Sequence, residues 1–453
     1  MTQVLVTIGP ISQSNNAIKS LALKTDLFRL NGSHNTLEWH KKMISKIRKI
    51  SPDSFILMDI PGIKPRTDNL NNIFIRKGEK ISFGRNIHCK EKIVSITKPL
   101  PKFDKKIKEF SINDGQHTFE LIRSSSNVIT GKSKSSFELL PKKGINIPKS
   151  LYNEKKQKEL YINFIDKIKD LDIDGLGLSF VQTGRLVKEI KNKVPNLILI
   201  SKIENSAGLE HKNDIIINSD GIMIDRGDLA AEIGNHLLFD AVESISKITK
   251  KFGKPLIMAT ENLNSMVDRT QPSKSEIISI GHSLKIGVDC IMLSEETATS
   301  KNFLETTKWI CKHSKKFPET LLTEYNEQNN FENIKFPELW SAVKQFPDLP
   351  IVLLSKSGHS LFNAMSLGQN RKITLFTDNN KIISLTKLFK NRINVVKVTN
   401  ISENTSSQIR NFIAKNKSLV FGKKSKLVAI YVSQYIRKVR ANNFSLFDKQ
   451  DFN

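Results

Sequence analysis

Short apolar runs rich in β-branched residues alternate with longer stretches of helical periodicity along the first two thirds of the chain. The short runs predict strands, and stretches such as 35–48 and 236–251 predict amphipathic helices. Nearly continuous apolar strands separated by helices are typical of a parallel sheet covered by helices, and eight such units predict an α/β fold of the (β/α)8 barrel type. The predicted strands are residues 4–9, 26–31, 55–60, 175–181, 197–204, 221–227, 255–260 and 290–296.

Two segments interrupt this alternation. Residues 67–147 carry short alternating segments separated by turn residues, which predicts a small β-barrel domain inserted after the third strand. After residue 316 a polar stretch is followed by apolar runs at 351–355, 373–376 and 394–398, which predicts a separate α/β domain. We therefore predict a catalytic barrel of residues 1–66 and 148–316, an inserted lid of residues 67–147 and a C-terminal α/β domain of residues 317–453.

Polar residues gather where the predicted barrel strands end, which is where barrel enzymes carry their active sites. Side chains alternate along a strand, so Lys202 and Glu204 point to the same face. Glu204 and Asp228 follow neighbouring strands and could share a hard divalent cation. Either motif alone could be a surface ion pair, but six strand ends with the same pattern favour an active site.

Composition narrows the class of protein further. The 453 residues carry a net charge of +26, but the lysines are spread along the whole chain without an aromatic-interleaved basic cluster. We therefore expect no nucleic-acid partner, although the charge favours anionic substrates. Apolar runs are too short to span a membrane, and no secretory signal precedes the first strand. Cys89, Cys290 and Cys311 lack metal-ligand spacing, which favours a reducing, cytoplasmic setting.

Six motifs and the segment that follows the insert resemble the pyruvate kinase family in order along the chain. The motifs are TIGP, RLNGSH, SKIEN, SDGIMIDRGDL, KPLIMATENLNSM and CIMLSEETA, and KKGINIP (142–148) is similar to the family's return from the inserted domain to the barrel. The resemblance is strong from residue 2 to about residue 310 and weak beyond it. It implies transfer of the phosphoryl group of phosphoenolpyruvate to ADP, giving pyruvate and ATP.

The resemblance also implies roles for individual residues. Arg29 and Lys202 would stabilise the phosphoryl group during transfer, and both would bind substrate. Gly227 and Asp228 would hold the substrate carboxylate through their backbone, and Thr260 would lie near the carbon that receives a proton. Magnesium or manganese would bind to Glu204 and Asp228. The nucleotide would be bound by Arg66, Lys143, His34 and Asn31.

A monovalent-cation site is implied at Asn31, Ser33 and Asp59. Family members that require potassium usually carry Glu where this chain has Lys64, and those that do not usually carry Lys. An internal ammonium can replace the potassium charge near the same oxygens, so we expect activity without added potassium.

Several positions depart from the family pattern. Asp225 stands where Ala is usual, and a further carboxylate there should weaken the binding of an anionic substrate unless it is paired or turned away. Arg226 and Arg29 are candidate partners for it. The other departures are Gln182 for Arg, Glu261 and Asn262 for Gln-Met, Glu295 for Gly, and residues 63–65 for Pro-x-Ile.

Regulation and assembly are less constrained. Residues Ser355 to Ser360 follow a predicted strand and would open a helix, and they fit either a polar turn or the loop that holds a sugar-phosphate effector. The resemblance implies a homotetramer. Two other functions stay open at this point: an enolate-chemistry barrel acting on another 2-oxo acid, and a catalytically weak relative with a regulatory role.

Overall fold

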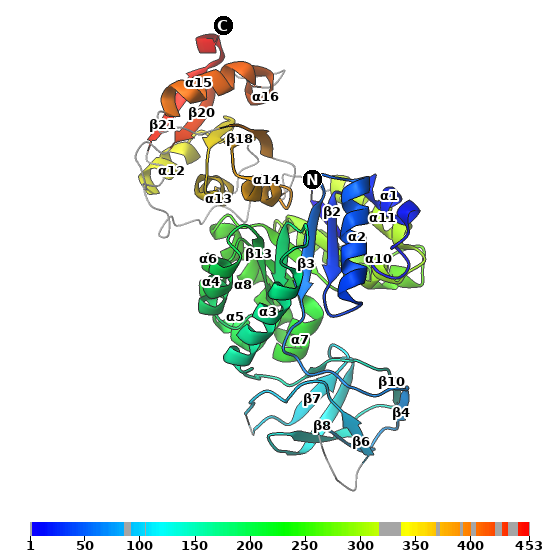
Figure 1. Ribbon diagram of the computed structural model, residues 1–453. Helices are drawn as coiled ribbons and strands as arrows, with labels where there is room; N and C mark the ends of the chain where they lie inside the picture. Colours follow the sequence, from blue (N-terminus) through cyan, green and yellow to red (C-terminus); the bar gives the residue numbers. More distant parts are fainter. Residues whose placement is uncertain are drawn as a thin grey trace.

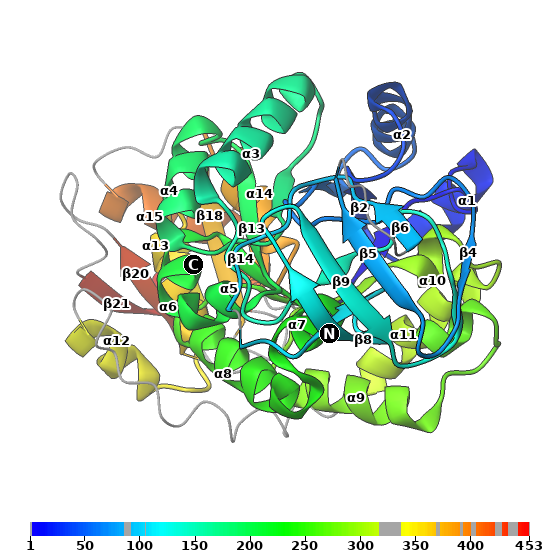
Figure 2. The same cartoon turned by 90° about the horizontal axis from the view of Figure 1, so that it is seen from below.

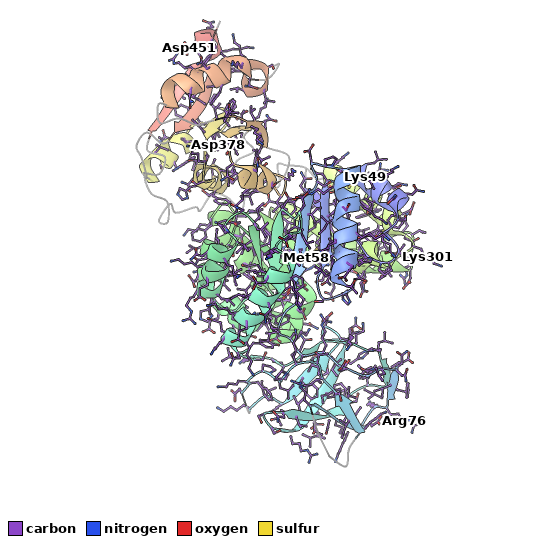
Figure 3. All side chains as sticks on the ribbon, viewed as in Figure 1. Lys49, Met58, Arg76, Lys301, Asp378 and Asp451 are labelled. Atoms are coloured by element: carbon purple, nitrogen blue, oxygen red, sulfur yellow. The ribbon has the colours of Figure 1, made fainter. Side chains whose placement is uncertain are left out.

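The computed structural model describes residues 2–85, 92–104, 106–316, 337–367, 372–389, 393–399, 405–421, 428–433 and 443–452. Cys89 lies outside the described residues. Figure 1 shows three parts in a row, with the barrel between the inserted β-rich part and the C-terminal part. Figure 3 places Met58 in the barrel, Arg76 in the insert and Asp378 in the C-terminal part.

Eight parallel strands close into a ring in the order β1-β16-β15-β14-β13-β12-β3-β2, which confirms the predicted barrel. Their side chains are almost all buried, because one face fills the barrel and the other packs against helices. The strands are β1 Gln3–Thr7, β2 Leu27–Asn31, β3 Phe55–Ile60, β12 Gly175–Leu178, β13 Ile198–Ile203, β14 Gly221–Asp225, β15 Leu256–Ala259 and β16 Cys290–Leu293.

Helices surround the ring, and several begin at a side-chain cap. Thr36 caps α2, and Ser273 forms a capping box with Glu276 at the start of α9. None of the described helices has the length and apolar character needed to cross a membrane. The helices of this part are α1 Asn15–Ala22, α2 Leu37–Ile50, α3 Glu154–Ile168, α4 Gly184–Lys193, α5 Ser206–Glu210, α6 Lys212–Asn218, α7 Arg226–Ile233, α8 Leu238–Lys251, α9 Lys274–Lys285, α10 Glu295–Ala298 and α11 Phe303–Lys316.

Six of the eight barrel strands end one to three residues before their predicted carboxyl ends, and β12, β14 and β16 are among them. β12 ends at Leu178, β14 at Asp225 and β16 at Leu293. Their polar followers lie in loops or first helical turns because helices begin at once: α7 at Arg226 and α10 at Glu295. The candidate site is therefore built from strand ends and helix starts together.

The insert is a β structure with a single apolar core. Hydrogen bonding joins its described strands into a six-stranded sheet, β11-β7-β8-β9-β5-β6, and a two-stranded sheet, β10-β4, rather than into one closed ring. A register shift between Leu121 and Arg123 bends the ladder of β8 and β9. In Figure 2 strands β5, β8 and β9 lie across the end of the barrel. The strands are β4 Ile73–Ile75, β5 Lys80–Gly84, β6 Lys92–Ser95, β7 Glu109–Ile112, β8 His117–Ser124, β9 Val128–Ser133, β10 Phe137–Leu139 and β11 Ile145–Asn146.

The C-terminal part is an α/β unit with a five-stranded sheet in the order β19-β18-β17-β20-β21. Its first three strands match the predicted runs, while β20 and β21, which pair antiparallel, were not predicted. The strands are β17 Ile351–Leu354, β18 Ile373–Thr377, β19 Ile393–Lys397, β20 Val428–Ser433 and β21 Asn443–Asp448, and the helices are α12 Pro337–Lys344, α13 His359–Ser366, α14 Asn380–Thr386, α15 Thr405–Lys415 and α16 Lys417–Phe421.

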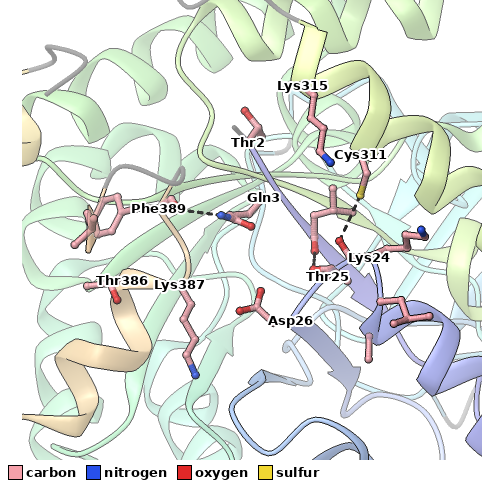
Figure 4. A pocket seen from close by; sticks show the side chains of 14 residues that line it. Thr2, Gln3, Lys24, Thr25, Asp26, Cys311, Lys315, Thr386, Lys387 and Phe389 are labelled. Atoms are coloured by element: carbon pink, nitrogen blue, oxygen red, sulfur yellow. Dashed lines mark hydrogen bonds between the residues drawn. The ribbon is translucent and has the colours of Figure 1, made fainter. Parts of the chain in front are cut away.

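The C-terminal part packs against the amino ends of the barrel strands. Ser384 donates a hydrogen bond of 2.7 Å to Asp174, and Lys381 bonds the carbonyl of Pro195 at 3.0 Å. A pocket of about 560 Å³ lies at this contact and includes Lys24, Lys315 and Lys387 in its lining (Figure 4). It is at the opposite end of the barrel from the polar strand ends.

Lys254 is the most deeply buried cation at this contact. Its Nζ donates to the carbonyl of Ser219 at 2.7 Å and lies 4.0 Å from the ring centroid of Phe362 in α13. Burial lowers the pKa of Lys254 to about 7, although the carboxylate of Asp220 acts in the opposite direction.

We predict that Lys254 makes stability rise with pH above neutrality. Between the folded pKa of about 7 and the ordinary value of 10.5, the unfolded chain holds a proton that the folded chain has released. The unfolding free energy of the wild type, relative to Lys254→Met, should rise by about 1.4 kcal/mol per pH unit in this window. Urea unfolding at pH 7 and pH 9 measures the difference, and a constant difference would contradict the prediction.

Candidate active site

Lys202 is the centre of a buried charge network at the carboxyl ends of the strands. It lies near the end of β13, where alternation places it on the same face as Glu204, as predicted. Its Nζ is 3.0 Å from Glu204 Oε2, 3.3 Å from Asp225 Oδ2 and 3.8 Å from Asp59 Oδ2. Burial alone would lower the pKa of Lys202, but the three carboxylates raise it above its ordinary value, so the ammonium stays charged.

Arg29 reaches the same network from β2. Its Nε and Nη2 lie 2.8 Å and 2.7 Å from Asp59 Oδ2, and its Nη1 donates to Thr7 Oγ1 at 3.1 Å. Burial would raise the pKa of Asp59, but Arg29 and Lys202 hold it below its ordinary value. The two cations predicted to act on the phosphoryl group therefore share one buried carboxylate.

Asp228 lies in the first turn of α7 and is paired with Lys64, which precedes the insert. Lys64 Nζ donates to Asp228 Oδ1 and also lies 3.2 Å from Asp114 Oδ1 in the turn between β7 and β8. Asn146 donates to the same oxygen of Asp228 at 3.3 Å. Burial would raise the pKa of Asp228, but the Lys64 ammonium lowers it to about 2. Lys64 thus links the barrel to the insert.

Thr260 follows β15 in a left-handed backbone conformation, with φ of 54°, and Glu261 follows with φ of 51°. Two such residues in succession are a strained turn that needs support. Arg226 supplies it by donating to the carbonyls of Thr260 and Glu261 at 2.7 Å and 2.8 Å. The Thr260 hydroxyl lies 2.9 Å from Asp225 Oδ1 and accepts a hydrogen bond from the backbone N–H of Gly227 at 3.2 Å.

Glu204, Asp225 and Asp228 each offer a carboxylate oxygen, and these three oxygens lie within 4.8 Å of one another. Burial raises the pKa of Glu204 to about 8, with Lys202 acting in the opposite direction and the other two acids adding to the rise. Hard oxygen donors at this spacing suit magnesium or manganese. The site therefore fits a divalent cation.

The predicted nucleotide residues lie around this network. Arg66 pairs through its backbone with Gly144, and its Nη1 donates to the carbonyl of Lys142 at 3.0 Å, so Arg66 and Lys143 mark the junction of barrel and insert. The pKa of His34 is lowered by burial and then by the charges of Arg66 and Arg29. In the part of the chain that is described, the side chain of Lys143 makes no hydrogen bond or ion pair.

The residues predicted for the monovalent-cation site lie at the ends of two neighbouring strands, β2 and β3. Asn31 Oδ1 accepts from the backbone N–H of Ser33 at 3.1 Å, and Asn31 is the register partner of Asp59. Asp59 itself is turned to Arg29 and Lys202. The Lys64 ammonium contacts Asp228 and Asp114, and among the described residues no ion pair joins it to Asp59.

The partner expected for Asp225 is also corrected. No ion pair joins Asp225 to Arg226 or Arg29 among the described residues. Arg226 is occupied with the Thr260 turn, and Arg29 with Asp59. Asp225 pairs with Lys202 and the Thr260 hydroxyl instead.

Two further departures from the family pattern, Asn262 and Gln182, make hydrogen bonds to backbone and side-chain groups around the charged residues. We call these surrounding groups the frame of the site. Asn262 accepts from Arg226 at 3.0 Å and donates to two strand carbonyls. Gln182 bonds both the N–H and the C=O of Tyr152 at 2.9 Å and 3.1 Å. Glu295 is exposed at the start of α10.

Sequence reasoning did not identify Asp114, Asn146 or the bracing role of Arg226. Asp114 lies in an Asn-Asp-Gly turn far along the chain from Lys64, and such a turn signals a hairpin but not its contacts. Arg226 was visible only as a neighbour of Asp225. Pairing across domains carries no local periodicity by which it could be found.

Lys202 and Arg29 are cations that lie next to a cluster of carboxylate oxygens, and such an arrangement suits chemistry on a phosphoryl group. At the mouth of a (β/α)8 barrel, this arrangement indicates a phosphotransferase. A family model described as "Pyruvate kinase, barrel domain" matches residues 1–307. The chain belongs to the pyruvate kinase family, and it is an enzyme with that family's function.

Relatives and one solved structure agree with this assignment. The pyruvate kinase of Thermococcus litoralis is 30% identical over 347 residues, covering 74% of this chain and 72% of the relative. That of Thermotoga maritima is 31% identical over 327 residues, covering 69% and 70%. A crystal structure of a pyruvate kinase from Cryptosporidium parvum has a TM-score of 0.80 at 23% identity, covers 99% of this chain and 96% of that one, and confirms the fold. The family generally uses a divalent metal ion.

We predict that Gly177→Ala disrupts the site from within the barrel wall. A Cβ on Gly177 would lie 2.0 Å from Asp59 Oδ1, so Asp59 would have to leave Arg29 and Lys202. Breaking a buried pair in this way should cost about 3 kcal/mol of unfolding free energy and most of the activity.

Gly281→Ala is the matched control, because a Cβ there meets nothing within 4 Å in the middle of α9. It should raise stability by up to about 1 kcal/mol. Chemical unfolding and turnover compare the two variants, and equal stability of Gly177→Ala and wild type would refute the role given to this position.

Proposed function

We propose that Lys202 and Arg29 stabilise the phosphoryl group as it passes from phosphoenolpyruvate to ADP. The observation that supports this most is the Lys202 ammonium, buried among three carboxylates next to Arg29. Negative charge on a transferring phosphoryl group is spread over its equatorial oxygens, so cations held in place stabilise the transition state. Both cations are held by protein contacts before substrate arrives.

Glu204 and Asp228 hold the divalent cation in this proposal, and magnesium and manganese both fit their oxygens. When bound, the cation supplies Lewis-acid stabilisation of the oxygens of the enolate that forms as the phosphoryl group leaves. Lys64 keeps Asp228 ionised, since it lowers the pKa of that carboxyl to about 2. The chain therefore presents at least one charged ligand at any physiological pH.

Thr260 serves the step in which the enol becomes pyruvate. The backbone of Gly227 and Asp228 at the start of α7 holds the substrate carboxylate, as a helix start favours an anion. The Thr260 hydroxyl is fixed by the Gly227 N–H at 3.2 Å and lies near the carbon that gains a proton when the enol becomes pyruvate. The strained backbone turn at Thr260 orients this hydroxyl.

The nucleotide binds between barrel and insert in this proposal, with Arg66 and Lys143 on its phosphates and His34 and Asn31 beside it. The insert, residues 67–147, acts as a lid between the two barrel segments, 1–66 and 148–316. Support comes from the contact of Asp114 with Lys64, which places the insert's turn against the site.

Assembly and regulation complete the proposal. The chain is a cytoplasmic homotetramer, and exposed Phe239 and Ile278 on α8 and α9 offer an apolar surface for subunit contact. In the C-terminal domain, residues 317–453, the turn from Ser355 to Ser360 is a candidate site for a sugar-phosphate effector. Ser355 Oγ accepts from Gly358 N–H at 3.0 Å just before α13, an arrangement that equally suits a plain polar turn.

We predict that Lys202→Met loses most turnover and keeps substrate binding. Removing a fixed cation from the transition state should lower kcat about a thousandfold, with a much smaller change in KM. A coupled assay of phosphoenolpyruvate and ADP with magnesium measures both. Lys191→Met is the control, because Lys191 pairs with Asp220 at the other end of the barrel. An unchanged kcat would remove Lys202 from the mechanism.

We also predict full activity without potassium. The Lys64 ammonium is permanently present at the mouth of the site, and Asp59 is already neutralised by Arg29 and Lys202. Initial rates in potassium chloride and in tetramethylammonium chloride of equal ionic strength should agree, while Lys64→Gln should lower the potassium-free rate. Activity that appears only with potassium would overturn this expectation.

A further inference from the structure

Asp225 contacts two side chains, Lys202 and Thr260, that the proposed function assigns to the substrate. Its Oδ2 lies 3.3 Å from the Lys202 ammonium, and its Oδ1 lies 2.9 Å from the Thr260 hydroxyl. The carboxylate is buried, with 6% of the residue exposed, so water screens it poorly. A buried anion is thus held by an ammonium and a hydroxyl in the middle of the site.

The same two groups are assigned to the substrate in the proposed function. Lys202 faces the phosphoryl group, and Thr260 lies near the carbon that receives the proton, next to the Gly227 backbone that holds the substrate carboxylate. An arriving phosphate ester must share or displace the Asp225 contacts, and it meets a like charge as it does so. Competition of this kind lowers the affinity for an anion without removing any catalytic group.

We propose that Asp225 is an affinity-determining residue whose carboxylate competes with the carboxylate and phosphate oxygens of the substrate for Lys202 and Thr260. The proposal rests on the roles given above to these two residues. In it, the charge of Asp225 sets how tightly phosphoenolpyruvate binds and leaves the phosphoryl-transfer groups in place.

A competing role is that of a third metal ligand, because an oxygen of Asp225 lies within 4.8 Å of those of Glu204 and Asp228. The contacts favour competition. Both oxygens of Asp225 are already engaged, Oδ1 by Thr260 and Oδ2 by Lys202. The hydrogen bonds of Asp228, by contrast, use Oδ1 alone, and among the described residues none reaches its Oδ2. Glu204 is engaged in the same way, since its Oε1 accepts from the Phe180 N–H and its Oε2 faces Lys202. What sets Asp225 apart is its contact with the Thr260 hydroxyl, and the affinity for manganese decides whether Asp225 also binds the cation.

The test separates charge from shape and substrate binding from metal binding. Asp225→Ala removes the carboxylate, and Asp225→Asn keeps its shape and a hydrogen-bond acceptor without the charge. Calorimetry measures the Kd of phosphoglycolate, an unreactive phosphate ester that carries a carboxylate, at a fixed magnesium concentration. Electron paramagnetic resonance measures the Kd of manganese alone.

Both variants should bind phosphoglycolate about tenfold more tightly than the wild type, with a matching fall in the KM for phosphoenolpyruvate and an unchanged manganese Kd. Asp220→Asn is the matched control: it is a buried acid before the opposite end of the same strand, paired with Lys191 and Lys381, and should change neither constant.

Three results would overturn the proposal: ester affinity that is unchanged or weaker in both variants, an Asn variant that binds like the wild type, or a tenfold loss of manganese affinity, which would make Asp225 a metal ligand. If Asp225→Ala does not fold, the Asn variant decides alone. Turnover of the wild type is assayed in parallel. Its absence would count against the proposed roles in catalysis, while the binding measurements would still decide the role of Asp225.

Discussion

The ammonium of Lys202 is the charge on which the rest of the site depends. A buried cation is tolerated only when carboxylates surround it, and those carboxylates in turn cannot be buried together without a cation between them. Asp59, Glu204 and Asp225 come from β3, the loop after β13 and the end of β14, so one ammonium ties neighbouring strand ends together. Each carboxylate then extends the network: Asp59 to Arg29, Asp225 to Thr260, and Glu204 to the backbone N–H of Phe180 at 2.7 Å. The positions of these side chains at the strand ends therefore follow from the balance between the charge of the ammonium and the charges of the carboxylates.

A second cation, Lys64, carries the network from the barrel to the insert. Its position just before the insert lets one ammonium contact Asp228 of the barrel and Asp114 of the insert. The same contact that lowers the pKa of Asp228 therefore also holds the insert against the barrel. In the proposed function, in which the insert is a lid and Asp228 a metal ligand, this one side chain would couple lid closure to the charge of the ligand. The three carboxylate partners of Lys202, by contrast, all belong to the barrel.

Most of the barrel and part of the site could be predicted from the sequence because both depend on local patterns. Apolar runs and helical periodicity located all eight strands, and two-residue alternation placed Lys202 and Glu204 on one face.

What could not be predicted depends on pairing between distant segments. The contact of Lys64 with Asp114, the turn of Asp225 towards Lys202 and the brace that Arg226 forms are choices among several reachable partners, and no local pattern ranks them. Strands β20 and β21 were missed although their sequences, VAIYVS and NFSLFD, carry a local strand pattern that could have identified them.

Two departures from the family pattern, Asn262 and Gln182, fall on the frame of the site and find hydrogen-bond partners there. Asn262 supplies the acceptor that Arg226 uses while that arginine holds the strained Thr260 turn. Gln182 bonds both backbone groups of Tyr152, so a buried side chain amide completes a pairing that would otherwise leave polar groups unsatisfied. Both of these substituted side chains therefore find hydrogen-bond partners within the frame. Asp225 differs from these two because its partners, Lys202 and Thr260, are the residues to which the proposed function assigns the substrate. For that reason a change at this position is expected to act on substrate affinity rather than on the frame.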